Sequence, residues 1–179
     1  MTPELKEFIK QQPMFFVASA PLSADGHVNL SPKGLDTFLA LGSQQIAYLD
    51  LTGSGNETAA HVMENERLTI MFCAFSGPPR ILRLYCRAKV VVRRSEEWPD
   101  LIKMFPSHPG TRQIIVGNIE FVQTSCGYSV PELKFVAERD TLTRWTEAKG
   151  EEGLVEYRRK NNRASLDALA TPTTDAVSE

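Results

Sequence analysis

Apolar residues in the first two thirds of the chain fall into short blocks that predict strands. Each block is strand-sized and rich in β-branched or aromatic side chains, which favour an extended backbone. These blocks span residues 14–20, 45–51, 67–75, 80–92 and 112–126. A turn with Asp25-Gly26 follows the first block and leads into residues 27–30, an arrangement typical of a β-hairpin. The pattern therefore predicts at least six strands.

Helical spacing of apolar residues is confined to a few stretches. It occurs over residues 3–12, which end before Pro13, over 57–65, around 96–105, and in the charged C-terminal third, 138–170. Strands that come early and helices that come late are typical of an α+β protein, a mainly β barrel or sandwich with added helices. They do not favour an alternating parallel α/β sheet. We expect residues 171–179 to form a flexible tail.

Length and composition bound the class of protein. The 179 residues, 42% of them hydrophobic, suffice for one packed domain, expected over residues 1–170 with a helical C-terminal extension from about 132. The 20 basic and 22 acidic side chains give a net charge of −2 without a long basic run, which argues against nucleic acid as a partner. The apolar runs are too short for a membrane-spanning helix or a secretory signal. We therefore expect a cytoplasmic protein.

The three cysteines do not form a metal-binding pattern. Cys73, Cys86 and Cys126 lie 13 and 40 positions apart, with no paired C-x-x-C and no histidine at ligand spacing. No histidine near Cys126 in sequence could activate it as a nucleophile. We expect structural thiols and no metal site.

A glycine-spaced turn between a predicted strand and a predicted helix is the first candidate for ligand binding. Gly53-Ser54-Gly55 lacks the third glycine of the dinucleotide fingerprint, where Thr58 stands, and no Gly-Lys-Ser/Thr follows. A capping box of Ser54 and Glu57 would account for the residues. A helix start with nearby glycines also offers backbone N–H groups to an anion. Both interpretations can hold on different donors.

A second polar segment strengthens the anion interpretation. Ser31-Pro32-Lys33-Gly34 follows a predicted strand, and Lys33 can offer a point charge to a phosphate. The order is then a strand, the glycine turn with its helix, Asn65-Glu66-Arg67 and a strand opening with arginines. Over about residues 12–128 this order resembles the pyridoxamine 5'-phosphate oxidase-related, FMN-binding split-barrel family. The resemblance implies a six-stranded split β-barrel and a homodimer with FMN sites at its interface.

The resemblance also implies where the FMN phosphate lies. The family places it between a strand-end basic residue and a Ser-Arg-Lys at the start of a helix that ends in Asn-Pro-Arg. Asn65 and Arg67 match the second motif, and counting back puts Asn56-Glu57-Thr58 in place of the first. The usual basic pair is absent. We expect Lys33, the Asn56 amide, the Thr58 hydroxyl and the backbone of the glycine turn to replace it.

The strand 80–92 has one apolar and one polar face. Alternation puts Leu82, Leu84, Cys86 and Ala88 on one side and Arg83, Tyr85 and Arg87 on the other. The polar side is either solvated or meets an anionic ligand or a partner chain. Arg80 is a similar candidate, and Tyr128 could stack near a flavin ring or pack in a core or an interface.

The resemblance implies an FMN-dependent oxidoreductase of unknown substrate, in which the cofactor supplies the chemistry and catalytic residues cannot be named. The C-terminal stretch RASLDALATPTTDAVSE lacks the Arg/His motif with which pyridoxamine-phosphate oxidases bind their substrate phosphate. Two alternatives remain: a non-catalytic flavin-binding or sensing protein, and a protein of the same fold that uses haem or a deazaflavin. His61 is expected to be a surface or capping residue. The candidate cofactor-binding residues are Ser31, Lys33, Gly34, Ser54, Gly55, Asn56, Thr58, Arg80, Arg83 and Tyr128.

Overall fold

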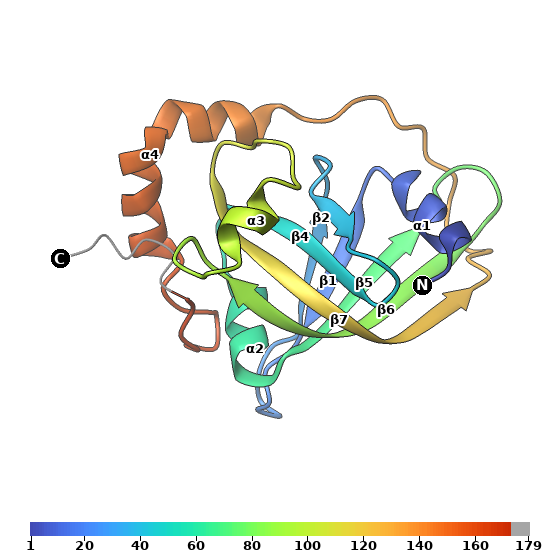
Figure 1. Cartoon of the computed structure of the whole chain (residues 1–179), viewed down its shortest axis with the longest axis horizontal. Coiled ribbons are helices and arrows are strands. Elements are labelled where there is room, and N and C mark those ends of the chain that lie inside the picture. Colours follow the sequence, from blue (N-terminus) through green and yellow to red (C-terminus); the bar gives the residue numbers. More distant parts are fainter. Residues whose placement is uncertain (173–179) are drawn as a thin grey trace.

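The strands of the computed structural model, which describes residues 1–172, form one curled antiparallel sheet (Figure 1). Within the described part of the chain the sheet has seven strands in the order β2-β1-β5-β6-β7-β4-β3. They are β1 (Phe15–Ser19), β2 (Asn29–Lys33), β3 (Phe38–Ala40), β4 (Gln45–Leu51), β5 (Arg67–Cys73), β6 (Ile81–Val91) and β7 (Thr111–Ser125). This is the split-barrel architecture that the resemblance implies, with seven strands instead of the expected six.

Four helices flank the sheet in the described residues: α1 (Pro3–Lys10), α2 (Glu57–Asn65), α3 (Trp98–Ile102) and α4 (Thr141–Asn161). In α4, Gly150 has φ of +65°, so the helix is kinked there. An extended segment, 126–140, leaves β7 and crosses the molecule to reach α4 (Figure 1). None of the helices among residues 1–172 is both long and apolar enough to cross a membrane.

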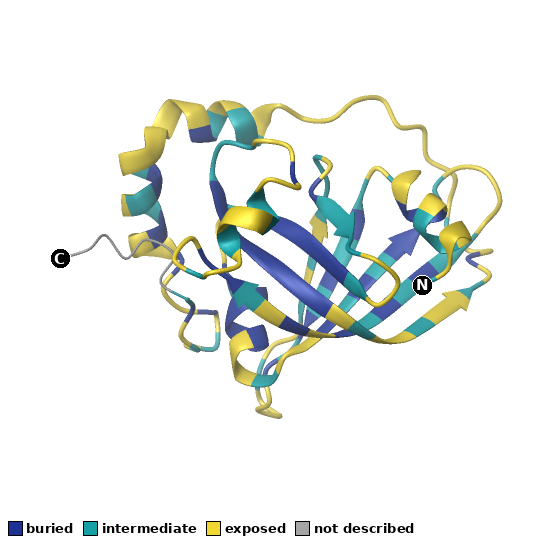
Figure 2. Cartoon of the chain, viewed as in Figure 1, coloured by how far each residue is buried: buried dark blue, intermediate teal, exposed yellow. Residues whose placement is uncertain are grey.

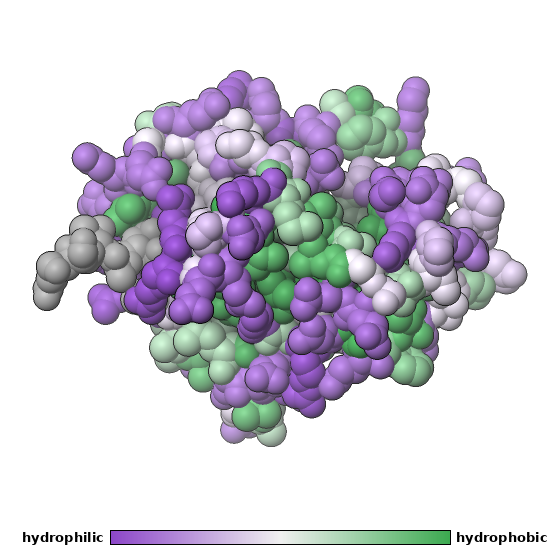
Figure 3. Space-filling model, viewed as in Figure 1, coloured by the Kyte–Doolittle hydropathy of each residue, from purple (hydrophilic) through white to green (hydrophobic). Residues whose placement is uncertain are grey.

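Two hydrophobic clusters share the long strand β7. Ile115 belongs to the larger cluster, which is enclosed by the curled sheet, α1 and α2. Ile114 and Val116 belong to the smaller one, which packs under α3. Figure 2 shows the resulting buried band along β4 and β7, and Figure 3 shows apolar side chains still visible at the centre of the same face. The first half of β7 is therefore buried on both faces, which holds this part of the strand in place.

Most predicted elements are confirmed, and β4 and α2 have the predicted bounds. The strand expected over 27–30 is instead Asn29–Lys33, so Ser31, Pro32 and Lys33 lie within β2 rather than after it. The third strand, β3, was not predicted because it has only three residues and no alternation. It is held by Phe38, whose ring centroid lies 5.0 Å from that of Phe72 and 5.2 Å from that of Phe15. The helix expected around 96–105 has five residues, and the C-terminal helical region is confined to α4. Thr171, the first residue of the expected tail, is buried, and residues 173–179 lie outside the described part.

The polar face predicted for strand 80–92 is confirmed in β6. Leu82 and Leu84 are fully buried, whereas Tyr85 is half-buried and Arg87 is exposed on the opposite face. At the turn after β7, Gly127 has φ of +68°, and a Cβ there would lie 3.0 Å from the backbone nitrogen of Arg80. Only glycine fits this turn, which directs segment 126–140 away from the sheet.

Candidate functional site

A polar cleft of about 520 Å³ opens where β2 ends, β4 passes into α2, and β7 begins. Most of the predicted cofactor-binding residues line it: Ser31, Lys33, Ser54, Gly55, Asn56 and Thr58. Lys33 is the last residue of β2, and the glycine turn directly follows β4. The structure therefore brings together two segments that the sequence proposed separately as a phosphate site.

Asp50 organises the charges of the cleft. Nζ of Lys33 donates to its Oδ1 (2.9 Å), while Nε and Nη2 of Arg112 donate to its Oδ2 (3.0 and 2.7 Å). Gln113 Nε2 also donates to Oδ2 (2.8 Å). Burial alone would raise the pKa of Asp50, but the charges of Arg112 and Lys33 and their hydrogen bonds outweigh it and hold the pKa well below its usual range. Asp50 is therefore ionised and holds two cations in place.

Arg112 and Asn162 fix the glycine turn through its carbonyl groups. Nη1 of Arg112 donates to the carbonyl oxygen of Gly55 (2.9 Å) and to Oδ1 of Asn162 (2.8 Å). Asn162 Nδ2 in turn donates to the carbonyl oxygen of Gly53 (3.0 Å). With the carbonyl groups bound in this way, the backbone N–H groups of residues 53–56 donate to no other residue in the described part of the chain.

These unpaired N–H groups fit a phosphate. Consecutive backbone N–H groups ahead of a helix are a common phosphate-binding arrangement, and the positive end of the helix dipole adds to it. Lys33, which lines the same cleft, adds a charge, and the hydroxyl of Ser31 adds a further polar group. The donor set of the cleft is thus suited to a phosphate monoester.

The predicted capping box is wrong. α2 begins at Glu57, its N-cap is Asn56 rather than Ser54, and the N-cap side chain makes no capping hydrogen bond. Oδ1 of Asn56 instead accepts from Gln113 Nε2 (2.8 Å), and Oε2 of Glu57 accepts from the backbone N–H of Leu166 (2.9 Å). The side-chain oxygens that could cap the helix therefore accept hydrogen bonds from residues distant in sequence instead.

Thr58 belongs to a polar network behind the cleft. Nδ2 of Asn29 donates to Oγ1 of Thr58 (3.1 Å), and Oγ of Ser31 donates to Oδ1 of Asn29 (3.1 Å). His61, one turn after Thr58, is fully buried and lies 3.0 Å from Oγ of Ser19 through Nδ1. The expectation of a surface or capping histidine is therefore wrong, because α2 turns this side chain against β1.

The other end of α2 explains the second matching motif. Oδ1 of Asn65 accepts from the backbone N–H of Arg67 (3.0 Å), and Nδ2 of Asn65 donates to the carbonyl oxygen of Ala20 (2.9 Å). Glu66, in place of the proline, takes a left-handed conformation with φ of +62°. Asn65 and Arg67 therefore end the helix and tie it to the loop after β1.

The remaining predicted residues lie away from the cleft within one chain. Nη1 of Arg80 donates to Oε1 of Glu4 (2.8 Å), Nη1 of Arg83 donates to Oγ of Ser125 (3.2 Å), and Tyr128 is 83% exposed. Gly34 follows Lys33 but lines two neighbouring cavities instead. Their contact with a cofactor stays a prediction.

Asp50, Arg112 and Asn162 are the residues of the cleft that the sequence analysis missed. Asp50 is the next-to-last residue of β4 and Arg112 is the second residue of β7, so both looked like ordinary residues near a strand boundary. A charged residue inside a block that is otherwise apolar on both faces is the signal that could have identified Asp50. Asn162 lies in a charged helix end and has no such signal.

The cysteines do not contribute to the cleft. Cys73 and Cys86 are buried, and burial raises the pKa of the Cys86 thiol to about 12, so this thiol stays protonated. Cys126 is exposed. In residues 1–172 no three His, Cys, Asp or Glu side chains are grouped closely enough to hold a metal ion.

The fold is that of a split-barrel protein, and sequence comparison identifies its family. The family model described as Pyridoxamine 5'-phosphate oxidase matches residues 1–126. The chain belongs to this family. The family protein ustO of Aspergillus flavus is 37% identical over 188 residues, covering 94% of this chain and 74% of the relative.

Two solved structures share the fold at low sequence identity. HupZ of Group A Streptococcus is 16% identical with a TM-score of 0.56, covering 75% of this chain and 99% of that chain. A putative pyridoxamine 5'-phosphate oxidase from Lactobacillus delbrueckii is 18% identical with a TM-score of 0.52, covering 69% of this chain and 93% of that chain. Both support the split-barrel fold alone.

Proposed function

We propose that the protein binds FMN, with the phosphate in the cleft between Lys33 and the glycine turn. The observation that carries this proposal is that residues 53–56, whose backbone N–H groups have no partner in the described part of the chain, line the same cleft as a lysine held by Asp50. Membership of the pyridoxamine 5'-phosphate oxidase family supports a flavin as the ligand that bears the phosphate.

The charges around the cleft favour an anion. Two cationic side chains, Lys33 and Arg112, face the single carboxylate of Asp50. Arg158, buried nearby, donates from Nε to Oγ1 of Thr52 (2.9 Å). Glu57 lies at the rim, where its carboxylate accepts the N–H of Leu166. The cations are held by the protein before a ligand arrives, so little ordering opposes binding.

We further propose that the protein is an oxidoreductase with an unknown substrate. Bound FMN would supply a ring that accepts and releases a hydride. The chain's own contribution is to bind the phosphate through Lys33 and residues 53–56, and to keep the turn rigid through Arg112 and Asn162. A firmly held phosphate fixes the orientation of the rest of the cofactor, which is how binding at a distance assists the reacting atoms.

The proposed assembly is a homodimer with the FMN sites at its interface. The outer face of β6 and β7 carries the contacting rings of Tyr85 and Phe121, whose centroids lie 6.0 Å apart. Phe121 is 62% exposed, and Tyr128 is exposed beyond it. A partner chain that covers these rings would remove apolar surface from water. It would also bring Arg83 and Tyr128 of each chain to the interface, where they could contact a cofactor.

The proposal is tested by adding FMN and then nicotinamide to the purified protein. We expect saturating FMN to raise the melting temperature, because a ligand that binds only the native state stabilises it. Under anaerobic conditions NADH or NADPH should then bleach the flavin absorbance, and oxygen should restore it. Absence of any FMN-dependent shift, or a shift with haem alone, would overturn the cofactor assignment. A bound flavin that neither nicotinamide reduces would favour a flavin-binding protein without turnover.

A further inference from the structure

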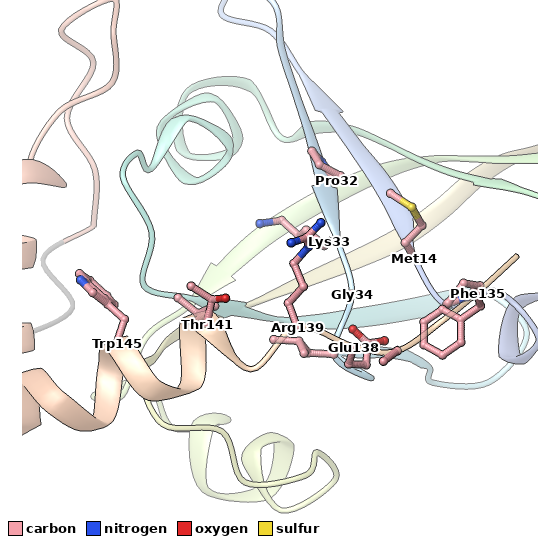
Figure 4. A pocket seen from close by; sticks show the side chains of 13 residues that line it. Met14, Pro32, Lys33, Gly34, Phe135, Glu138, Arg139, Thr141 and Trp145 are labelled. Atoms are coloured by element: carbon pink, nitrogen blue, oxygen red, sulfur yellow. The ribbon is translucent and has the colours of Figure 1, made fainter. Parts of the chain in front are cut away.

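A second cavity, of about 590 Å³, lies on the other side of the end of β2 (Figure 4). It is bounded by the residues before β1, by residues 32–35 and by residues 135–145, the end of the crossing segment and the first turn of α4. Pro32 and Lys33 line both this groove and the phosphate-suited cleft. The two spaces are therefore neighbours separated by the end of one strand.

The walls of the groove are mainly apolar and partly rigid. Met14 and Phe135 both line it, on the side away from Trp145 in the view of Figure 4. Trp145 lies at one end, and its ring packs edge-on against Tyr157 with centroids 5.0 Å apart. Phe135 is 57% exposed without a ligand. An apolar or aromatic molecule in the groove would cover these surfaces and gain the free energy of their burial.

One cation of the groove has no partner. Arg139 makes no hydrogen bond or ion pair with any residue between 1 and 172. In Figure 4 its side chain extends toward Lys33, which Asp50 already holds. The next arginine, Arg144, is by contrast paired with Asp140 (2.9 Å). Glu138 also lines the groove, but it forms no ion pair with Arg139.

We infer that this groove binds the substrate of the proposed flavoprotein, an organic anion with one carboxylate on an aromatic or apolar body. The guanidinium of Arg139 would pair with the carboxylate, a geometry for which arginine is well suited. The body would lie along Met14, Phe135 and Trp145. This inference rests on the proposed function, because the groove is assigned to a substrate by its position beside the proposed FMN phosphate site. Lys33 lines both spaces.

The test uses a pair of probes that differ in charge alone, 1-naphthylacetate and the neutral 1-naphthylacetamide. Calorimetry with FMN-loaded protein should show the acetate binding about tenfold more tightly, the scale of one charge-assisted hydrogen bond. Arg139→Gln should weaken binding of the acetate about tenfold and leave binding of the amide unchanged. Arg139→Lys should retain part of the difference in affinity between the two probes. Arg144→Gln is the matched control and should change neither. Phe135→Ser should weaken both probes.

The outcomes separate this inference from the FMN proposal. The groove assignment is overturned, even when FMN binds, if both probes bind with equal affinity or if Arg139→Gln leaves the affinity for the acetate unchanged. Competition between FMN and the acetate also overturns it, because the groove would then belong to the cofactor. If FMN fails to bind but the acetate still depends on Arg139, the anion groove stands and the FMN proposal falls.

Discussion

At the scale of single residues, Asp50 determines the properties of the cleft. It is buried, ionised and bound to both Lys33 and Arg112, so its removal would leave a buried guanidinium without its counterion. The cost of breaking a buried ion pair on one side exceeds what the intact pair contributes to stability. Asp50 therefore stabilises the fold and, at the same time, lowers the positive charge that a phosphate would meet.

This role predicts a pH-dependent stability. The folded-state pKa of Asp50 is depressed, so its contribution is fully present above the unfolded pKa of about 4 and is lost as pH falls toward the folded value. Asp50→Asn should lower the free energy of unfolding at pH 7 by about 3–5 kcal/mol. Denaturant unfolding should show that the difference in unfolding free energy between the native protein and the variant becomes smaller below pH 4. A difference that is constant from pH 7 to pH 3 would contradict the charge assignment.

Thr58 offers a gain-of-charge test at the same scale. It lines the cleft where the family has a lysine, and its Oγ1 accepts from Asn29. Thr58→Lys should tighten FMN binding and leave riboflavin, which lacks the phosphate, little changed. Thr58→Met, of similar length but uncharged, is the control. Calorimetry showing the same FMN affinity for the lysine and methionine variants would place the phosphate elsewhere.

At the scale of elements, the end of α4 supports a turn more than a hundred residues earlier in the chain. Asn162, directly after α4, joins Arg112 to the carbonyl of Gly53. The following segment is tied to the start of α2 by the N–H of Leu166, and to His27 by Asp167, whose pKa is lowered by the hydrogen bond from His27. The C-terminal part of the chain thus closes one side of the cleft.

Asn162→Ala should therefore affect both stability and binding. It removes one of the two acceptors of Arg112 Nη1, which keeps the Gly55 carbonyl, and it removes the donor to the Gly53 carbonyl, at a cost of about 1–3 kcal/mol in unfolding free energy. Because the turn is then held less firmly, FMN binding should weaken too. Asn161→Ala is the matched control, since its exposed side chain donates only to the carbonyl of Tyr157. If the two variants behave alike in thermal melts and FMN titrations, α4 does not support the cleft.

The elements also show what sequence can predict. Most strands and the bounds of α2 follow from local periodicity, although β3 does not. Lys33 and the glycine turn stand at element ends, where ligands commonly bind. The pairs that complete the cleft, Asp50 with Arg112 and Arg112 with Asn162, join residues 62 and 50 positions apart. No local pattern encodes such contacts. The cap of α2 was misjudged for the same reason, because Gln113 competes for Asn56 from another strand.

At the scale of the whole molecule, the exposed rings on β6 and β7 predict self-association. Phe121→Glu would place a charge beside Tyr85 in the proposed interface, where desolvation opposes it. Sedimentation velocity at micromolar concentration should show a dimer for the native protein and monomer for this variant. Met104→Glu, at an exposed apolar residue after α3, is the control and should remain dimeric. A native protein that sediments as a monomer would contradict the proposed assembly.

The central claim is the position of the FMN phosphate, so the most direct measurement compares FMN with riboflavin on three proteins by calorimetry. FMN should bind the native protein more tightly than riboflavin does. Lys33→Ala should weaken FMN by about 1.5–3 kcal/mol, the scale of a charge-assisted hydrogen bond, with a loss that shrinks as salt rises. Riboflavin should be little affected, and Lys103→Ala, at an exposed lysine paired with Asp100, should change neither. Equal affinities for FMN and riboflavin, or an equal loss of both in Lys33→Ala, would contradict a phosphate site in this cleft.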